Sequence, residues 1–91
     1  MKELMYKMII SPNEGASFNC MYYKTTQKST INNDIMTYGI EIVKESLNII
    51  EKSRFDDIYV CENKVDELLK SLAHHNVTPI TLKDIILDWV N

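Results

Sequence analysis

What the sequence lacks excludes several classes of protein. It has no catalytic motif, no phosphate-binding loop and no complete set of metal ligands, so it predicts neither an enzyme nor a bound cofactor. No apolar run reaches the roughly 20 residues of a transmembrane helix, and no basic segment followed by an apolar one indicates a signal peptide. Two cysteines, Cys20 and Cys61, are too few for a disulfide framework. These absences favour a cytoplasmic protein with reduced thiols and no membrane contact.

Positive charge is also scarce. The net charge is −3 and Arg54 is the only arginine, which gives no electrostatic reason to expect binding to nucleic acid or an anionic membrane. The apolar fraction of 45% and charged fraction of 25% are ordinary for a globular protein. Ninety-one residues suffice for one domain, which we divide into a sheet over residues 1–61 and a helical pair over residues 62–91.

Two amphipathic helices are predicted near the C-terminus. The first carries an apolar stripe at i, i+3, i+4 and i+7, formed by Val65, Leu68, Leu69 and Leu72. We expect Asn63 to cap its start. Asn76 should end it in a left-handed conformation, with Leu72 and Val77 touching. Thr81 is the expected cap of the second helix, whose stripe consists of Leu82, Ile85, Ile86, Trp89 and Val90.

Alternating apolar residues predict strands in the rest of the chain. These are expected over Lys2–Ile10, Phe18–Thr26, Ile35–Val43 and Leu47–Glu51, with Asp57–Cys61 left open as a fifth strand or an extended entry to the first helix. The polar segment Gln27–Asn33 reads as a loop. Gly39 interrupts the third strand and indicates a bulge or a close approach of another backbone.

The economical arrangement is an α+β fold, an antiparallel meander of four to five strands with both helices packed on one face of the sheet. Tyr38, Ile40 and Ile42 should face the helices. The opposite face is more apolar than a solvated face needs to be. We therefore predict that it contacts a partner through Met5, Ile9, Met21, Tyr23 and Val43. The alternative is that the Gln27–Asn33 loop covers these residues.

The segments Tyr38–Ile42 (YGIEI) and Val77–Trp89 (VTPITLKDIILDW) resemble a small family of uncharacterised domains from anaerobic spore-forming bacteria. That family shares an early Y-G-I-E strand and a late V-x-P-x-x-L-x-D ending. The resemblance covers roughly half of the chain and implies no catalytic residue, substrate or cofactor.

Other candidate sites have simpler explanations. His74 and His75 with Cys20 or Cys61 lack zinc-site spacing, and a helix separates Cys61 from the two histidines, which argues against a Cys–His catalytic pair. An acidic patch lacks calcium-loop spacing; it comprises Asp56, Asp57, Glu62, Asp66 and Glu67. A helix-turn-helix reading fails because the second helix offers acidic residues where base contacts are needed.

The function most compatible with these features is that of a non-enzymatic protein-interaction module, a homodimer or a small cytosolic regulator that docks on another protein. The alternative is an accessory protein of a nucleic-acid transaction that binds the enzyme more than the DNA. A small enzyme or a metal-binding protein comes third.

Overall fold

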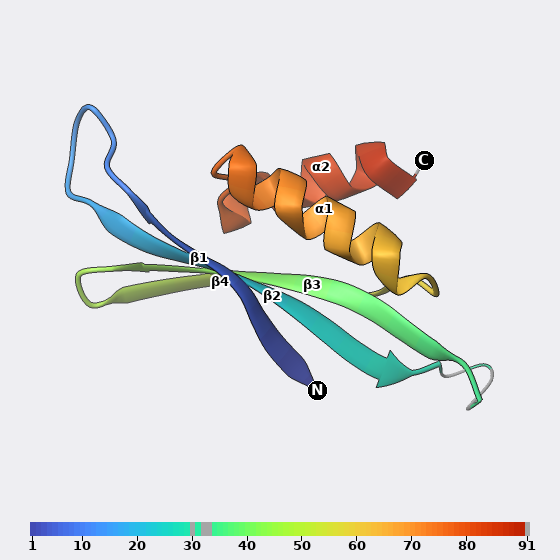
Figure 1. The fold of residues 1–91 in the computed structure, drawn as a ribbon. Coiled ribbons are helices and arrows are strands. Elements are labelled where there is room, and N and C mark those ends of the chain that lie inside the picture. Colours follow the sequence, from blue (N-terminus) through green and yellow to red (C-terminus); the bar gives the residue numbers. More distant parts are fainter. Residues whose placement is uncertain (30, 32–33, 91) are drawn as a thin grey trace.

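The computed structural model describes residues 1–29, 31 and 34–90, without the side chains of Trp89 and Val90. Four antiparallel strands form one sheet in the order β1-β2-β3-β4, and two helices follow. The strands are β1 (Lys2–Ile10), β2 (Phe18–Lys28), β3 (Met36–Ser46) and β4 (Ile49–Tyr59), and the helices are α1 (Glu62–His74) and α2 (Pro79–Val90). Both helices lie on the same face of the sheet (Figure 1). The predicted α+β meander is confirmed.

β1 has the predicted bounds, and the other three strands are longer than predicted. The fourth predicted strand and the possible fifth are one continuous element, β4, so Asp57–Tyr59 is strand and not a separate entry to α1. β3 continues to Ser46, where a two-residue turn with Leu47 at φ 54° leads into β4. β2 runs to Lys28 and takes in the first residues of the predicted loop; residues 30, 32 and 33 of that loop lie outside the described part of the chain.

Helix α1 ends as predicted and begins differently. Asn76 has a positive φ of 52°. The Val77 N–H donates to the Leu72 carbonyl at 3.0 Å and the Asn76 N–H donates to that of Ala73 at 3.1 Å. These two bonds define a Schellman ending. The predicted cap Asn63 is wrong, because α1 begins at Glu62 with Cys61 in the capping position and no side-chain cap.

The start of α2 also lies earlier than predicted. Pro79 is its first residue, where its fixed φ suits a helix and its missing N–H has no intrahelical partner to lose. Thr81 is therefore inside the first turn, and its hydroxyl donates to the Thr78 carbonyl at 3.2 Å instead of capping the helix. The prediction that Thr81 caps α2 was wrong because it overlooked the preference of proline for the first position of a helix.

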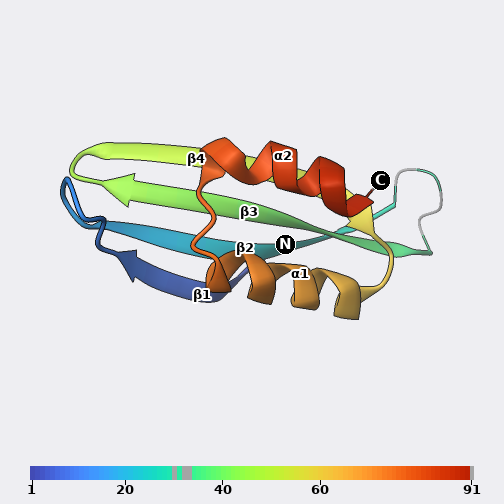
Figure 2. The same ribbon diagram turned by 90° about the horizontal axis from the view of Figure 1, so that it is seen from above.

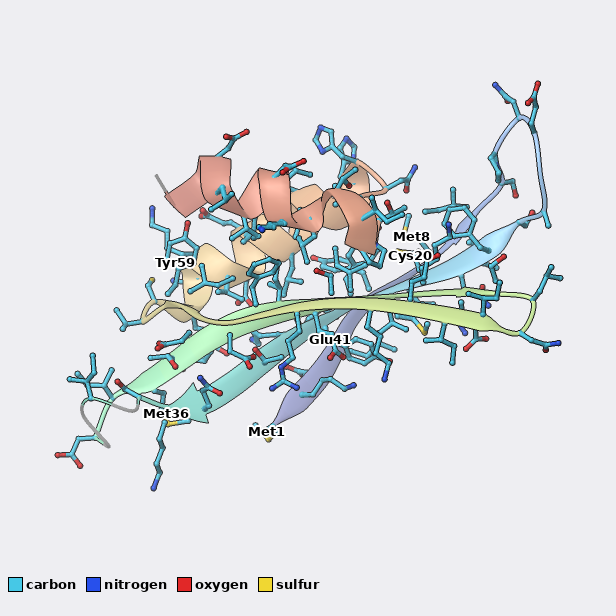
Figure 3. The ribbon with its side chains drawn as sticks, turned by 180° about the vertical axis from the view of Figure 1, so that it is seen from behind. Met1, Met8, Cys20, Met36, Glu41 and Tyr59 are labelled. Carbon is cyan, nitrogen blue, oxygen red and sulfur yellow. The ribbon has the colours of Figure 1, made fainter. Side chains whose placement is uncertain are left out.

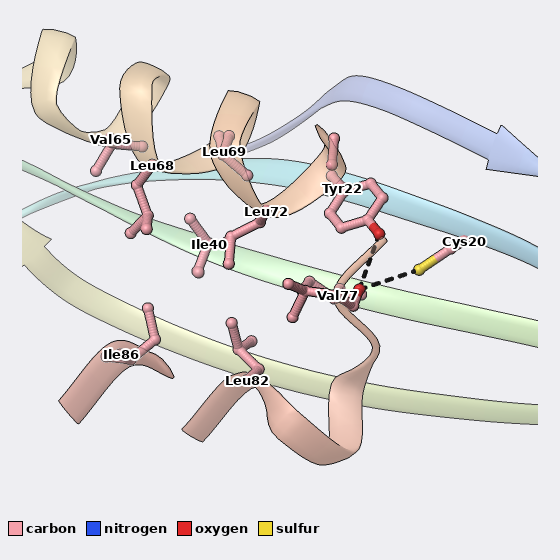
Figure 4. Packing of buried hydrophobic residues seen from close by; sticks show 12 residues of the cluster. Cys20, Tyr22, Ile40, Val65, Leu68, Leu69, Leu72, Val77, Leu82 and Ile86 are labelled. Atoms are coloured by element: carbon pink, nitrogen blue, oxygen red, sulfur yellow. Dashed lines mark hydrogen bonds between the residues drawn. The ribbon is translucent and has the colours of Figure 1, made fainter. Parts of the chain in front are cut away.

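The core lies between the helices and the sheet. Ile40 and Ile42 on β3 and Tyr22 on β2 are fully buried beneath the two helical stripes (Figure 4). The stripe residues that fill this layer are Val65, Leu68, Leu69 and Leu72 of α1 and Leu82 and Ile86 of α2. The predicted orientation of β3 toward the helices is thus confirmed. The side chains of Trp89 and Val90, also assigned to the α2 stripe, lie outside the described side chains.

The helices cover only part of the sheet. At 1.5 Å per residue the 13-residue α1 is about 20 Å long, whereas at about 3.3 Å per residue the 11-residue β3 is about 36 Å long. Figure 2 shows the consequence: the end of the sheet that carries the β1–β2 and β3–β4 turns projects beyond both helices. We call this part the helix-free end and define it by residues 9–10, 18–19 and 44–51. Among the described residues, no helix has the length and apolar character needed to cross a membrane.

Candidate functional site

The predicted partner-binding residues do not form one continuous patch. Register places Tyr23 opposite Glu41, Met21 opposite Val43 and Ile9 opposite Asn19, all on the face away from the helices, which we call the open face. Ile9 is 74% exposed, Met21 and Tyr23 are half-buried, and Val43 is only 8% exposed. Whether these four residues bind a partner stays a prediction.

Met5 does not lie on the open face. The register of β1 shifts between Leu4 and Tyr6, so Met5 is an extra residue in the ladder. Such a bulge alters the strict alternation of faces. Met5 consequently packs against the helix-side core, whereas Leu4 pairs with Tyr23 on the open face and is 48% exposed. The face assigned to Met5 was wrong because sequence alternation assumes an unbroken ladder.

The centre of the open face is polar, and its charged side chains pair with one another. The Glu41 side chain is only 8% exposed, although it points away from the helices (Figure 3). Its Oε2 accepts a 2.8 Å bond from Lys2 Nζ, and its Oε1 lies 4.0 Å from Arg54 Nη1. Lys2 Nζ also lies 4.5 Å from the centroid of the Tyr23 ring. These two cations offset the cost of burying the Glu41 carboxylate, which would be high for an unpaired charge.

Beside the ion pairs of Glu41 with Lys2 and Arg54, β4 approaches β3 unusually closely. The register between them shifts between Tyr38 and Ile40, and a Cβ on Gly39 would overlap the Phe55 carbonyl oxygen and lie 2.7 Å from Asp56 Cα. The close backbone approach predicted from Gly39 is therefore confirmed. Asp56 is held by Thr25 Oγ1 at 3.0 Å and by Arg54 Nε at 2.8 Å. These contacts join β2 and β4 across the glycine.

A second charged cluster joins the sheet to the start of α1. Lys24 Nζ donates to Glu62 Oε2 at 2.6 Å and to Asp66 Oδ1 at 3.0 Å, and it lies 3.9 Å from Glu3 Oε1. Burial lowers the pKa of Lys24, but the bonds to Glu62 and Asp66 outweigh that and raise it overall. The amine therefore stays charged in an almost fully buried position. It fixes the first turn of α1 on β2.

Three of the five residues of the predicted acidic patch lie in these two clusters. Asp56 lies on the open face and pairs with Arg54, and Glu62 and Asp66 lie on the helix side, where Lys24 pairs with both. Within residues 1–29, 31 and 34–90, no three or more His, Cys, Asp or Glu side chains gather as a metal site would require.

The cysteines and histidines lie apart. Cys20 is fully buried, its Sγ lies 3.6 Å from the Val77 carbonyl oxygen, and burial raises the pKa of its thiol. Cys61 is exposed at the start of α1, whereas His75 follows the end of that helix and its Nδ1 lies 2.9 Å from the Ser71 carbonyl oxygen. The separation predicted between Cys61 and the histidines is thus observed, and Cys20 is held as a packing residue.

Exposed apolar side chains gather at the helix-free end. Ile9, Leu47, Ile49 and Ile50 are between 58% and 85% exposed. Ile49 lies on the helix side of the sheet, Ile9 and Ile50 lie on the open face, and Leu47 lies in the turn between β3 and β4. Sequence reasoning found only Ile9 of this group. The run Leu47-Asn48-Ile49-Ile50 was a visible signal, but it was read as the start of an ordinary strand.

The comparisons with known proteins identify a family without a known activity. Neither the curated proteins nor the solved structures include a match to the chain. The model of one protein family, described as a family of unknown function (DUF6514), matches residues 1–91 and therefore the full length of the sequence. This match covers the sheet and both helices together. The chain belongs to the family of unknown function DUF6514.

Proposed function

We propose that this chain is a non-catalytic protein-interaction module that acts by self-association, and that its contact surface is the helix-free end of the sheet. The observation that carries the proposal is the exposure of Ile9, Leu47, Ile49 and Ile50 within one end of a small domain. Exposed apolar side chains concentrated at one end of a small domain favour a contact surface, which here extends over both faces of the sheet and the β3–β4 turn. Burying it also stabilises a domain whose own core is thin.

The rest of the open face is less suited to this role. Its centre holds Glu41 between Lys2 and Arg54, and these side chains already satisfy one another. A partner seated there would have to desolvate an ion-pair network, which seldom contributes net affinity. The helix-free end offers apolar side chains without that penalty. We place the protein in the cytosol, where the thiols of Cys20 and Cys61 would stay reduced.

The test is the solution mass of a variant in which Ile49 and Ile50 are both replaced by Ser. Multi-angle light scattering should show a dimer for the wild type and a monomer for this variant at the same concentration. Ile80→Ser is the matched control, because Ile80 is 76% exposed on α2, outside the helix-free end, and it should leave the dimer intact. A dimer that survives the double replacement would contradict the proposal.

A further inference from the structure

The helix side of the helix-free end is a shelf that neither helix covers. It is formed by Ile10, Phe18, Lys44, Ser46, Ile49 and Glu51, of which Ile10 also packs against the core. Four of these residues, Lys44, Ser46, Ile49 and Glu51, line a hollow of about 210 Å³. The end of α1 and the connector to α2 bound the shelf on one side (Figure 2). Figure 1 shows that the β1–β2 turn rises on the same side of the sheet as the helices, so the shelf lies between this turn and the helix connector.

Two charged residues on the shelf are neighbours that do not pair. Lys44 and Glu51 are direct cross-strand partners on β3 and β4. Lys44 Nζ nevertheless lies 4.5 Å from the centroid of the Phe18 ring, and Glu51 Oε2 is buried without a hydrogen-bond partner among the described residues. A buried acceptor without a donor is costly and rare in folded proteins. Within the described part of the chain, the Glu51 carboxylate therefore has no cation and Lys44 has no carboxylate, although both side chains line the same hollow.

We propose that a second copy of this chain docks on the shelf, related by a two-fold axis, so that Lys44 of each copy pairs with Glu51 of the other. This inference rests on the proposed function and names its partner and its contact. In a two-fold interface, residue i meets residue j and residue j meets residue i. One unpaired cation and one unpaired anion on the same surface are therefore complementary to their own copy, and the contact forms twice.

Apolar and aromatic side chains on the shelf also fit this arrangement. In a two-fold dimer formed through this surface, the shelf of each copy covers the shelf of the other. Ile49, 63% exposed on the shelf side, then supplies apolar contact beside the ion pairs. The Phe18 ring on the floor of the shelf adds aromatic area of the kind enriched in interfaces.

Pairing of edge strands is a poorer route to a dimer. β1 has charged residues and a bulge at Met5. β4 has five charged residues and a register shift beyond Phe55. Charges and irregularities of this kind are how natural sheets protect their edges from pairing with another chain. The shelf is therefore the favoured contact.

Charge reversal tests the reciprocal pairs. Lys44→Glu sets two glutamates against each other in both contacts, and Glu51→Lys sets two lysines. By sedimentation equilibrium, each variant should dissociate with a constant at least about tenfold higher than that of the wild type, because like charges across an interface oppose binding. The double variant Lys44→Glu/Glu51→Lys should return to wild-type affinity. Circular dichroism must show that each variant is folded.

An equimolar mixture of the two single variants is the decisive measurement. One chain then carries two glutamates and the other two lysines, so both contacts between unlike chains are complementary. We expect a heterodimer of near wild-type affinity from two chains that are monomers alone. Within one copy Lys44 and Glu51 are also neighbours, but repulsion inside a chain cannot be relieved by mixing. Monomers in the mixture would overturn the inference.

Two further variants keep the inference testable if a reversal unfolds the chain. Lys44→Gln and Glu51→Gln remove charge without repulsion, and each should raise the dissociation constant several-fold. Ile49→Ser should weaken the dimer more than Ile50→Ser, which has similar exposure on the opposite face. A wild-type dimer indifferent to Lys44, Glu51 and Ile49 would overturn this inference and leave the proposed function standing. A wild-type monomer would overturn both.

Discussion

The Tyr22 hydroxyl donates a 2.8 Å hydrogen bond to the carbonyl of Val77, 55 residues later in the chain. Tyr22 is fully buried in β2, and Val77 is the residue that follows the left-handed end of α1. Cys20 Sγ lies 3.6 Å from the same carbonyl oxygen (Figure 4). The connector between the helices is thus fixed to the centre of the sheet. Its position sets where the helices stop covering the strands and where the helix-free end begins.

Replacing Tyr22 by Phe removes the hydroxyl and keeps the ring. We expect the free energy of unfolding to fall by about 1–2 kcal/mol, because a buried carbonyl loses its main donor. Urea unfolding followed by circular dichroism measures the change. Tyr23→Phe is the matched control, since Tyr23 lies half-buried on the open face. Equal stability of the Tyr22 and Tyr23 variants would contradict the role given to the Val77 contact.

The same residue predicts a response to alkaline pH. Burial, followed by the hydrogen bond with Cys20, raises the pKa of Tyr22 above its ordinary value of 10.0. An unfolded tyrosine ionises near that value, so the stability linked to Tyr22 is complete below about pH 10 and is lost as the pH rises further. Above about pH 10 the wild type should lose stability more steeply than Tyr22→Phe. Parallel pH profiles for the two proteins would be inconsistent with this linkage.

Gly39 is the position least tolerant of a side chain. Because a Cβ there would meet the backbone of Phe55 and Asp56 as well as Thr25 Oγ1, Gly39→Ala should destabilise the fold by about 1–3 kcal/mol through overpacking. Gly15→Ala provides the contrast. Gly15 has φ 97° but no atom within 4 Å of the added carbon, so only backbone strain remains. Thermal unfolding should rank Gly39→Ala below Gly15→Ala, and the reverse order would refute the close approach of β4.

The end of α1 gives a further prediction. Asn76 has φ 52°, a conformation that glycine adopts freely and that a β-branched residue resists. Asn76→Gly should leave the melting temperature unchanged or raise it, whereas Asn76→Val should destabilise by about 1–2 kcal/mol. Both variants lose the asparagine side chain, so their difference isolates the backbone effect. Similar melting temperatures would mean that the left-handed conformation is unimportant for stability.

Sequence patterns predicted those parts of the fold that are set by neighbouring residues. The left-handed end at Asn76 and the alternation of Tyr38, Ile40 and Ile42 follow from local propensity and regular spacing, and both are confirmed. Met5 was misplaced because a bulge breaks the period on which alternation depends. The start of α2 was missed although Pro79 signalled it.

The candidate contact surface was less predictable than the fold. Lys24 reaches Glu62, 38 residues away, and Lys44 turns toward Phe18 instead of its strand neighbour Glu51. These choices depend on tertiary packing and side-chain conformation, which no spacing in the sequence encodes. The extent of the helix-free end depends in the same way on where the Tyr22 contact places the helix connector. Sequence alone predicted an interaction surface on the open face, and that surface stays a prediction beside the one proposed at the helix-free end.

The most direct test of the central claim is sedimentation equilibrium of the wild-type protein over a wide range of concentrations. Self-association through the helix-free end predicts an average mass that rises with concentration from that of one chain toward that of two, and no further, because a two-fold contact closes on itself. A mass that stays at one chain throughout the range would contradict the claim.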